Sequence, residues 1–416
     1  MNLDLPSLEL PFFTNLLILL VTARFFGELF ERFRQPSMIG EIIAGIILGP
    51  SLLNFIHRTE DIKVISELGI FLLVILVGLE INIDDILKSL KGKNIIISIM
   101  AFFIPMISGI TVGYFYGLEM MTTAFIGLCV AITALPVSIR ILMDLGKINS
   151  VVGKKIISVA IFDDVLALSI LGVLLNIKNT DMSVIAVVKV ASVSMLKLFL
   201  FIGILSFSYF MIKKLSSKGN YIEISLNKLL HFLKGKETLF AIFFAFILLF
   251  STITETLGFH FIIGAFFASM LVSDTLIGKN NLKKIEKTTS RLAMGFLAPI
   301  FFAGIGLEFS FSSINNLGLL VSIVLVSYLS KIIGGYMGSR FAGFNSKVAI
   351  TIGIGLNARG IMELVIANIA YKAGLINIEI FSILVIMGVM TTLTTPMMLK
   401  QSFERIEKTV KPQIIN

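Results

Sequence analysis

Residues 161–166 read Ile161-Phe162-Asp163-Asp164-Val165-Leu166, and the two adjacent aspartates restrict the kind of fold that can hold them. They lie near the middle of an apolar run over about 151–175, which is long enough to cross a bilayer as a helix. A carboxylate at that depth is rarely kept unless it meets water, a cation or a basic partner. Neighbours on a helix point about 100° apart, so Asp163 and Asp164 cannot face the same group. We expect one to face a water-filled cavity and the other a buried positive charge.

The composition is that of a polytopic helical membrane protein. Of 416 residues, 56% are hydrophobic and only 15% are charged, whereas about a quarter of a soluble domain is charged. The formal charge of +9 does not indicate nucleic-acid binding, because the basic residues lie in short loops between apolar runs. The single cysteine, Cys129, lies inside an apolar run, so we expect neither a disulfide framework nor a thiol metal site.

The apolar runs predict an all-α membrane protein with about thirteen transmembrane helices. The predicted spans are 12–30, 36–53, 62–82, 94–116, 120–143, 151–175, 183–212, 238–256, 259–275, 291–311, 316–340, 347–371 and 379–399. Lysine and arginine crowd one alternating set of loops, so the positive-inside rule predicts an external N-terminus and a cytoplasmic C-terminus. The mixed polar and apolar stretch 220–236 predicts an interfacial helix, and we expect 400–416 to be a cytoplasmic tail.

The chain repeats itself in order. Ile39-Gly40 with Ala44-Gly45 matches Ile263-Gly264 with Ala268-Ser269, Gly78-Leu79-Glu80 matches Gly306-Leu307-Glu308, and Thr133-Ala134-Leu135 lies over Asn357-Ala358-Arg359. The members of each pair are an odd number of spans apart, so the two copies run in opposite directions through the membrane. Inverted-topology repeats are typical of secondary transporters whose binding site lies at the membrane midplane.

Both members of the third matched pair lie beside features that weaken a helix. Pro136 follows Thr133, and a proline removes a backbone donor and clashes with the preceding turn. Gly353, Gly355 and Gly360 surround Asn357. We therefore predict two broken helices that cross near the midplane, with half-helix ends facing a cavity.

Two further groups of charged side chains are candidates for this site. Arg359 and Glu363 are four residues apart on one helical face, where they can neutralise each other and, with Asn357, the ends of the half-helices. Lys331 lies at the centre of the eleventh predicted span and is too deep to reach water, so it needs a buried anion. Asp163 is the natural candidate for that anion, and a purely structural ion pair is the alternative.

Several motifs together resemble a known family. Pro36-Ser37-Met38-Ile39-Gly40-Glu41, Leu48-Gly49-Pro50, Gly78-Leu79-Glu80, Thr133-Ala134-Leu135-Pro136, Phe162-Asp163-Asp164, Lys331 and Asn357-Ala358-Arg359-Gly360 resemble the second group of monovalent cation–proton antiporters. This family contains bacterial Na⁺/H⁺ exchangers and Kef-type K⁺/H⁺ antiporters. The resemblance implies a homodimer with a dimerisation domain (1–82 and 238–311), a mobile transport core (94–175 and 316–399) and a linking segment (183–237).

The resemblance also assigns roles to the site residues. It implies that Asp164 carries the cation and the proton in turn, and that Asp163 pairs with Lys331. The Thr133 hydroxyl and freed backbone carbonyls are expected to help hold a transient Na⁺ at Asp164, because hard cations prefer oxygen ligands. No cofactor is expected, and the transported species are Na⁺, with Li⁺ or K⁺ as further candidates, and H⁺.

The sequence therefore predicts a secondary active antiporter, not an enzyme, in the inner membrane of a bacterial cell, with membrane lipid around it. Kef-type members usually replace the first aspartate and append a nucleotide-binding domain, neither of which we expect here, so Na⁺/H⁺ exchange is favoured. Ala134-Leu135-Pro136 is closer to the K⁺ exchangers, so a K⁺/H⁺ antiporter or a K⁺ efflux channel is the alternative. An intramembrane aspartic protease is rejected, because its two carboxyls must come from separate segments to share a proton.

Overall fold

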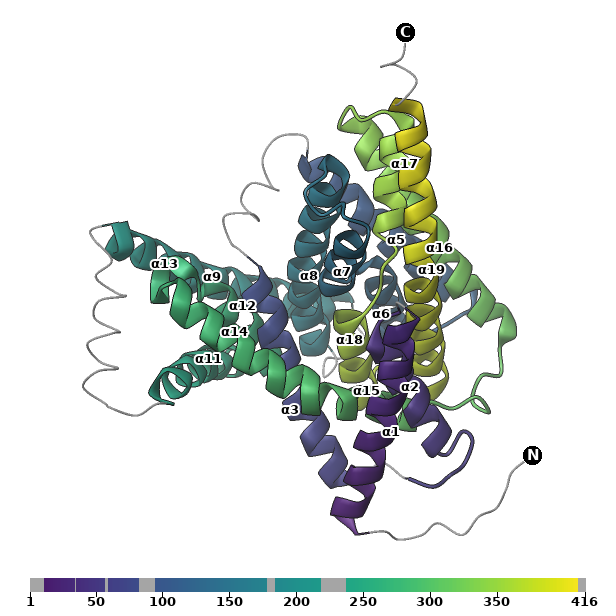
Figure 1. Ribbon diagram of the computed structural model, residues 1–416, viewed down its shortest axis with the longest axis horizontal. Helices are drawn as coiled ribbons and strands as arrows, with labels where there is room; N and C mark the ends of the chain where they lie inside the picture. Colours follow the sequence, from purple (N-terminus) through teal and green to yellow (C-terminus); the bar gives the residue numbers. More distant parts are fainter. Residues whose placement is uncertain are drawn as a thin grey trace. The chain divides into compact units, whose positions relative to one another are not determined.

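The structure is a computed structural model that describes residues 11–33, 35–56, 59–81, 94–177, 184–217 and 237–410. These residues form helices joined by loops, with no strand among them, so the predicted all-α fold is confirmed. In chain order (Figure 1) the helices are α1 (Phe12–Arg32), α2 (Ser37–Leu48), α3 (Glu60–Glu80), α5 (Asn94–Phe115), α6 (Met120–Ala131), α7 (Leu135–Asp144), α8 (Val151–Ile177), α9 (Val184–Ser217), α11 (Thr238–Thr256), α12 (Phe261–Leu271), α13 (Asp274–Ile277), α14 (Lys279–Leu292), η1 (Ala293–Leu297), α15 (Ala298–Glu308), α16 (Leu317–Phe341), α17 (Ser346–Gly355), α18 (Ile361–Lys372) and α19 (Ile378–Val410).

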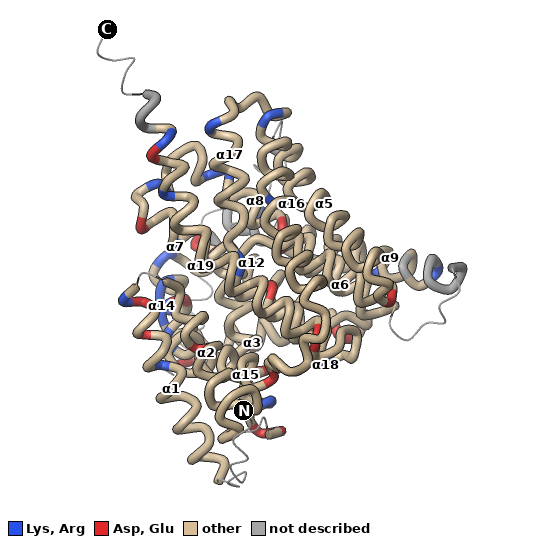
Figure 2. The backbone as a smooth tube through the Cα atoms, turned by 90° about the vertical axis from the view of Figure 1, so that its right-hand side faces the viewer, with Lys and Arg blue, Asp and Glu red and all other residues tan. Residues whose placement is uncertain are grey.

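The described helices include 10 segments that are long and apolar enough to cross a membrane. Three shorter apolar helices, α2, α12 and α17, fall in the second, ninth and twelfth predicted spans. Most charged residues lie near helix ends, and long stretches of helix between them carry none (Figure 2). The multi-pass membrane architecture is confirmed, whereas the number of thirteen spans stays a prediction.

Two helices begin or end differently from their predicted bounds. Residues 279–290, which lie between two predicted spans, belong to α14, and the π-helical turn η1 connects α14 to α15. Helix α19 continues through 400–410, where we expected a tail. It continues because Ser402 and Phe403 are buried, and the Ser402 hydroxyl lies 2.6 Å from that of Thr351. The predicted interfacial helix at 220–236 lies outside the described residues.

The chain divides into two compact units. Unit 1 contains Met1–Ser66, Asp85–Ala167 and Pro299–Asn416, and unit 2 contains Glu67–Asp84 and Leu168–Ala298. All the candidate site residues belong to unit 1. The division into a dimerisation domain and a transport core follows different bounds and stays a prediction.

The repeat predicted from the sequence recurs as a packing pattern in each unit. In unit 1, a Cβ atom at Gly40 of α2 would lie 2.2 Å from the carbonyl oxygen of Phe26 in α1. In unit 2, a Cβ atom at Gly264 of α12 would lie 2.4 Å from the carbonyl oxygen of Phe250 in α11. Phe250 follows Phe26 by the same number of residues as Gly264 follows Gly40. The two helix pairs therefore make their closest approach at equivalent positions.

A second pair of close approaches is also equivalent. In unit 1, a Cβ atom at Gly306 of α15 would lie 2.2 Å from the carbonyl oxygen of Ile42 in α2. In unit 2, a Cβ atom at Gly78 of α3 would lie 2.6 Å from the carbonyl oxygen of Phe266 in α12. In unit 1, α2 of the first repeat packs on α15 of the second repeat. In unit 2, α12 of the second repeat packs in the equivalent way on α3 of the first repeat. This reciprocity supports the repeat, whose inverted orientation stays a prediction.

Both predicted broken helices occur. Residues 132–134 separate α6 from α7, where Pro136 occupies the first turn of α7, and residues 356–360 separate α17 from α18. The two breaks touch, because the Ala134 N–H donates to the carbonyl oxygen of Ala358 at 2.8 Å. A Cβ atom at Gly360 would lie 2.9 Å from the Cβ atom of Ala134, so a side chain at Gly360 would force the breaks apart. The prediction of two crossing broken helices is confirmed.

The close contact at Gly306 predicts a loss of stability on substitution. Gly306→Ala places a methyl group against backbone atoms of α2, and such overpacking costs roughly 1–3 kcal/mol. Thermal unfolding in detergent can be followed with a thiol-reactive dye, because Cys129 is the one cysteine and is buried. Gly203→Ala is the control, since a Cβ atom at Gly203 has no neighbour within 4 Å. Equal unfolding temperatures for the two variants would contradict the packing argument.

Candidate ion-binding site

Five ionisable side chains form a fully buried cluster in unit 1. They are Asp163, Asp164, Lys331, Arg359 and Glu363, each with 0% of its surface exposed. A buried charge is stable only when it is paired and hydrogen-bonded. With all five ionised, three carboxylates face two cations, and the cluster carries one negative charge in excess.

Lys331 has all its hydrogen-bonding capacity used. Its ammonium Nζ lies 2.8 Å from Asp163 Oδ2 and donates to the carbonyl oxygen of Ala101 at 3.0 Å and to that of Ala131. A lysine ammonium has three N–H donors, and here each has an acceptor. The structure thus places Asp163 and Lys331 together, in a hydrogen-bonded ion pair inside the helix bundle.

Thr133 lies on the Asp163 side of this pair. Its hydroxyl is 2.8 Å from Asp163 Oδ2 and 3.1 Å from the carbonyl oxygen of Leu356, and a hydroxyl has only one proton to donate. We expected Thr133 to act with Asp164. Its described contacts tie Asp163 to the break between α17 and α18, and its role beside Asp164 stays a prediction.

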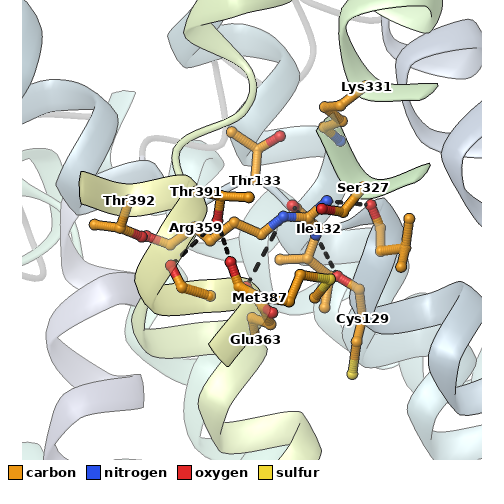
Figure 3. Close-up of polar contacts among 12 residues, drawn as sticks. Cys129, Ile132, Thr133, Ser327, Lys331, Arg359, Glu363, Met387, Thr391 and Thr392 are labelled. Atoms are coloured by element: carbon orange, nitrogen blue, oxygen red, sulfur yellow. Dashed lines mark hydrogen bonds and ion pairs between the residues drawn. The ribbon is translucent and has the colours of Figure 1, made fainter. Parts of the chain in front are cut away.

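Arg359 caps the end of α6. Its Nη1 donates to the carbonyl oxygens of Cys129 and, at 3.1 Å, of Ile132, and its Nη2 donates to that of Val130 at 2.6 Å (Figure 3). The last carbonyls of a helix have no partner within the helix and carry a partial negative charge. Together with the Lys331 contact to Ala131, two buried cations therefore occupy four successive carbonyls, those of 129–132.

Glu363 and Asn357 are held more loosely than Lys331 and Arg359. Glu363 Oε2 lies 4.0 Å from Arg359 Nε, at the outer limit of an ion pair, and accepts no hydrogen bond from the described residues. Glu363 is in the first turn of α18, where the positive end of the helix dipole favours a carboxylate. Asn357 is fully buried, and neither atom of its amide has a hydrogen-bond partner within the described part of the chain.

One group of residues around the site escaped the sequence analysis. The Thr392 hydroxyl donates to the carbonyl oxygen of Arg359 at 2.8 Å and so fixes the backbone at the second break. Thr391, Thr392 and Thr395 are fully buried in α19. The sequence feature that could have identified them is the polar run Thr391-Thr392-Leu393-Thr394-Thr395 in an otherwise apolar span.

Comparison with known proteins identifies the family. A model of the family described as "Sodium/hydrogen exchanger, transmembrane" matches residues 16–404. The chain belongs to the sodium/hydrogen exchanger family. Members of this family are transporters, so the predictions of a cation–proton antiporter and of a protein that is not an enzyme are confirmed.

Relatives of similar length support the assignment to this exchanger family. The chain is 29% identical over 405 residues to the Na(+)/H(+)-K(+) antiporter GerN of Bacillus cereus, covering 97% of this chain and 99% of GerN. It is 30% identical over 393 residues to the probable Na(+)/H(+) antiporter GerT of the same organism, covering 94% and 99%. Its fold is similar to that of the sodium proton antiporter MjNhaP1 from Methanocaldococcus jannaschii, with a TM-score of 0.69, 16% identity, and coverage of 94% of this chain and 96% of the other.

The ion pair predicts a coupled effect on stability. Lys331→Ala leaves Asp163 without its buried counter-charge, so we expect a loss of roughly 3–5 kcal/mol. Adding Asp163→Asn to Lys331→Ala should restore part of this loss, although the carbonyls of Ala101 and Ala131 remain uncapped. Dye labelling of Cys129 during heating measures all three variants. Additive losses, with no recovery in the double variant, would show that the two residues are not partners.

The capping of α6 predicts that lysine cannot replace Arg359. Arg359→Lys keeps the charge, but an ammonium lacks the planar fork that reaches three carbonyls at once. We expect a loss of about 1–3 kcal/mol, because at least one buried acceptor is left unpaired. Arg340→Lys is the matched control, since Arg340 is exposed and donates to one carbonyl, that of Phe344. If Arg359→Lys lowers the unfolding temperature no more than Arg340→Lys does, this account of the capping is wrong.

Proposed function

We propose that this sodium/hydrogen exchanger exchanges Na⁺ for H⁺ across the membrane, and that Asp164 binds the two ions in turn. The observation that carries the proposal is the charge balance of the buried cluster, where three carboxylates face two cations. One monovalent cation or one proton removes the excess negative charge. The site is therefore matched in charge to the two ions that an Na⁺/H⁺ exchanger has to carry.

The two adjacent aspartates have different surroundings, and this difference supports separate roles. Asp163 Oδ2 accepts hydrogen bonds from both Lys331 and Thr133. Releasing Asp163 to bind an ion would leave the buried Lys331 without its counter-charge. Of the two adjacent aspartates, we therefore assign Asp164 to the transported ion.

Competition at one carboxylate gives a mechanism for exchange. The empty, fully ionised cluster would be costly to move past an apolar barrier, because it carries an uncompensated charge. Binding of a cation or a proton at Asp164 neutralises the cluster, so the core moves only when it is loaded. Alternating access of this loaded site to the two sides of the membrane then couples the two gradients.

The charges at one end of unit 1 support the proposed orientation. Lys147 lies over the ring of Phe403 at 5.8 Å, and Lys155 over that of Phe344 at 5.9 Å, so the loops before α8 and α17 and the end of α19 lie close together. Arg140, Lys154, Arg340, Lys347, Lys400 and Arg405 belong to the same helix ends and loops. We propose from the positive-inside rule that this end of unit 1, with the C-terminus, faces the cytoplasm. The proposed location is the inner membrane of a bacterial cell.

Helix α1 supports the proposed homodimer. It exposes an apolar stripe at every fourth residue, made of Phe13, Leu17, Val21, Phe25 and Leu29. Residues four apart lie on one face of a helix, so the stripe forms a continuous ridge suited to a second copy of α1 or to lipid tails. The predicted dimerisation domain, 1–82 and 238–311, contains this ridge.

A second cation is suggested by the name of one relative. GerN is named a Na(+)/H(+)-K(+) antiporter, and this chain is 29% identical to it. We therefore include K⁺ as candidate cargo beside Na⁺, and we keep Li⁺ as a further candidate from the sequence analysis. Each salt can be supplied in turn to vesicles that contain the purified protein and a pH-sensitive dye.

The mechanism predicts that Asp164→Asn abolishes cation-driven proton flux. Asparagine keeps the size of the side chain but neither ionises nor exchanges a proton, so flux should fall to that of empty vesicles. The protein should still insert and fold, as measured by the unfolding temperature. Asp144→Asn is the matched control, because Asp144 is exposed at the end of α7 and should leave exchange unchanged. Normal Na⁺/H⁺ exchange by Asp164→Asn would refute the mechanism.

A further inference from the structure

Many backbone oxygens at the two breaks are already occupied. The carbonyls of 129–132 accept hydrogen bonds from Arg359 and Lys331. Beyond these, the carbonyl of Leu356 lies within reach of the Thr133 hydroxyl, and that of Ala358 accepts from the Ala134 N–H. A cation that has left most of its water behind needs several oxygen ligands, so side-chain oxygens have to supply part of its shell.

Asn357 has the properties of such a ligand. Its side chain is fully buried, and neither its amide oxygen nor its amide nitrogen has a hydrogen-bond partner in the described residues. A buried amide without partners is costly and calls for an explanation. An amide oxygen is a hard, uncharged ligand atom, and oxygen atoms of this type coordinate alkali and alkaline-earth cations in proteins.

The position of Asn357 in the structure also supports a role as a cation ligand. Its neighbours in the chain, Leu356 and Ala358, contact Thr133 and Ala134 of the other break. Thr133 in turn contacts Asp163, the residue before Asp164. Asp163 Oδ1, like the amide of Asn357, has no hydrogen-bond partner in the described residues. The backbone of Asn357 therefore lies where the two breaks cross, next to the Thr133 hydroxyl that contacts Asp163.

We propose that the amide oxygen of Asn357 is a direct ligand of the transported alkali cation and sets how tightly the site holds that cation relative to a proton. The inference rests on the proposed function of Asp164 as the ion carrier. A proton bonds to one carboxylate oxygen and needs no further ligand, whereas the cation needs a shell of oxygens. Asn357 therefore contributes to cation affinity and leaves proton affinity unchanged.

The test is the dependence of exchange on both ions in vesicles. Asn357→Ala should raise the KM for Na⁺ about tenfold or more, since an interaction with a charged group is lost. The maximal rate at saturating Na⁺ and the proton inhibition constant, obtained from the KM at several pH values, should stay close to those of the unchanged protein. Asn357→Ser keeps one oxygen at shorter reach and should give an intermediate KM. Asn368→Ala is the control, because Asn368 is an equally buried amide on α18 that donates to Glu308 at 3.2 Å.

A second measurement covers variants that fold but transport poorly. Na⁺ should raise the unfolding temperature of the purified protein. A given shift should need about tenfold more Na⁺ in Asn357→Ala and an intermediate amount in Asn357→Ser. An unchanged Na⁺ requirement in both variants overturns the proposal, as does equal weakening of Na⁺ and proton binding, which would indicate a structural role. Exchange that survives Asp164→Asn refutes the carrier assignment instead, so failure of the proposed function is distinguishable from failure of this inference.

Discussion

The candidate ion-binding site depends on the capping of four successive carbonyls, those of 129–132, by two buried cations. The break after α6 leaves these carbonyls without the N–H groups that a continuous helix would supply. Lipid offers no donors, so the protein has to provide them. Arg359 and Lys331 do so. Two cations inside a membrane protein then require anions, and this requirement explains why buried carboxylates surround the break.

The two repeats share their packing but not their chemistry. Gly40 and Gly264 make equivalent close approaches, as do Gly306 and Gly78. The aspartates come from α8 in the first repeat, whereas Lys331, Arg359 and Glu363 all come from the second. Arg359, which caps three of the four carbonyls at the first break, therefore belongs to the second broken helix, and Lys331, which caps the fourth, belongs to α16. Cations of the second repeat therefore interact with carbonyls and a carboxylate of the first repeat. These interactions hold the two breaks together where their backbones cross.

The features that a local pattern encodes were predictable from the sequence. Pro136 predicted the first break, and the glycines around Asn357 predicted the second, because both residue types act on the backbone where they stand. Lys331 and Asp163 could be paired because a buried cation requires a buried anion and few were available.

The partners of Arg359 were not predictable in this way. Spacing on a helix favoured Glu363, but the structure gives Arg359 its short contacts with carbonyls of the other broken helix. Backbone carbonyls look the same at every position of a sequence, so only the fold shows which of them lack donors. The same limit applies to the end of α19, which continues past its apolar run because Ser402 and Phe403 find buried partners.

The adjacency of Asp163 and Asp164 has a consequence for the charge that moves during exchange. Lys331 holds two carbonyls besides Asp163, so it keeps two of its three acceptors if Asp163 takes up a proton. The lysine can then remain a cation, and protonation of Asp163 adds a positive charge to the buried cluster. Protonation of Asp164 alone only cancels the excess negative charge of the cluster. In the mechanism proposed above, the number of charges carried in each cycle therefore depends on whether Asp163, as well as Asp164, takes up a proton.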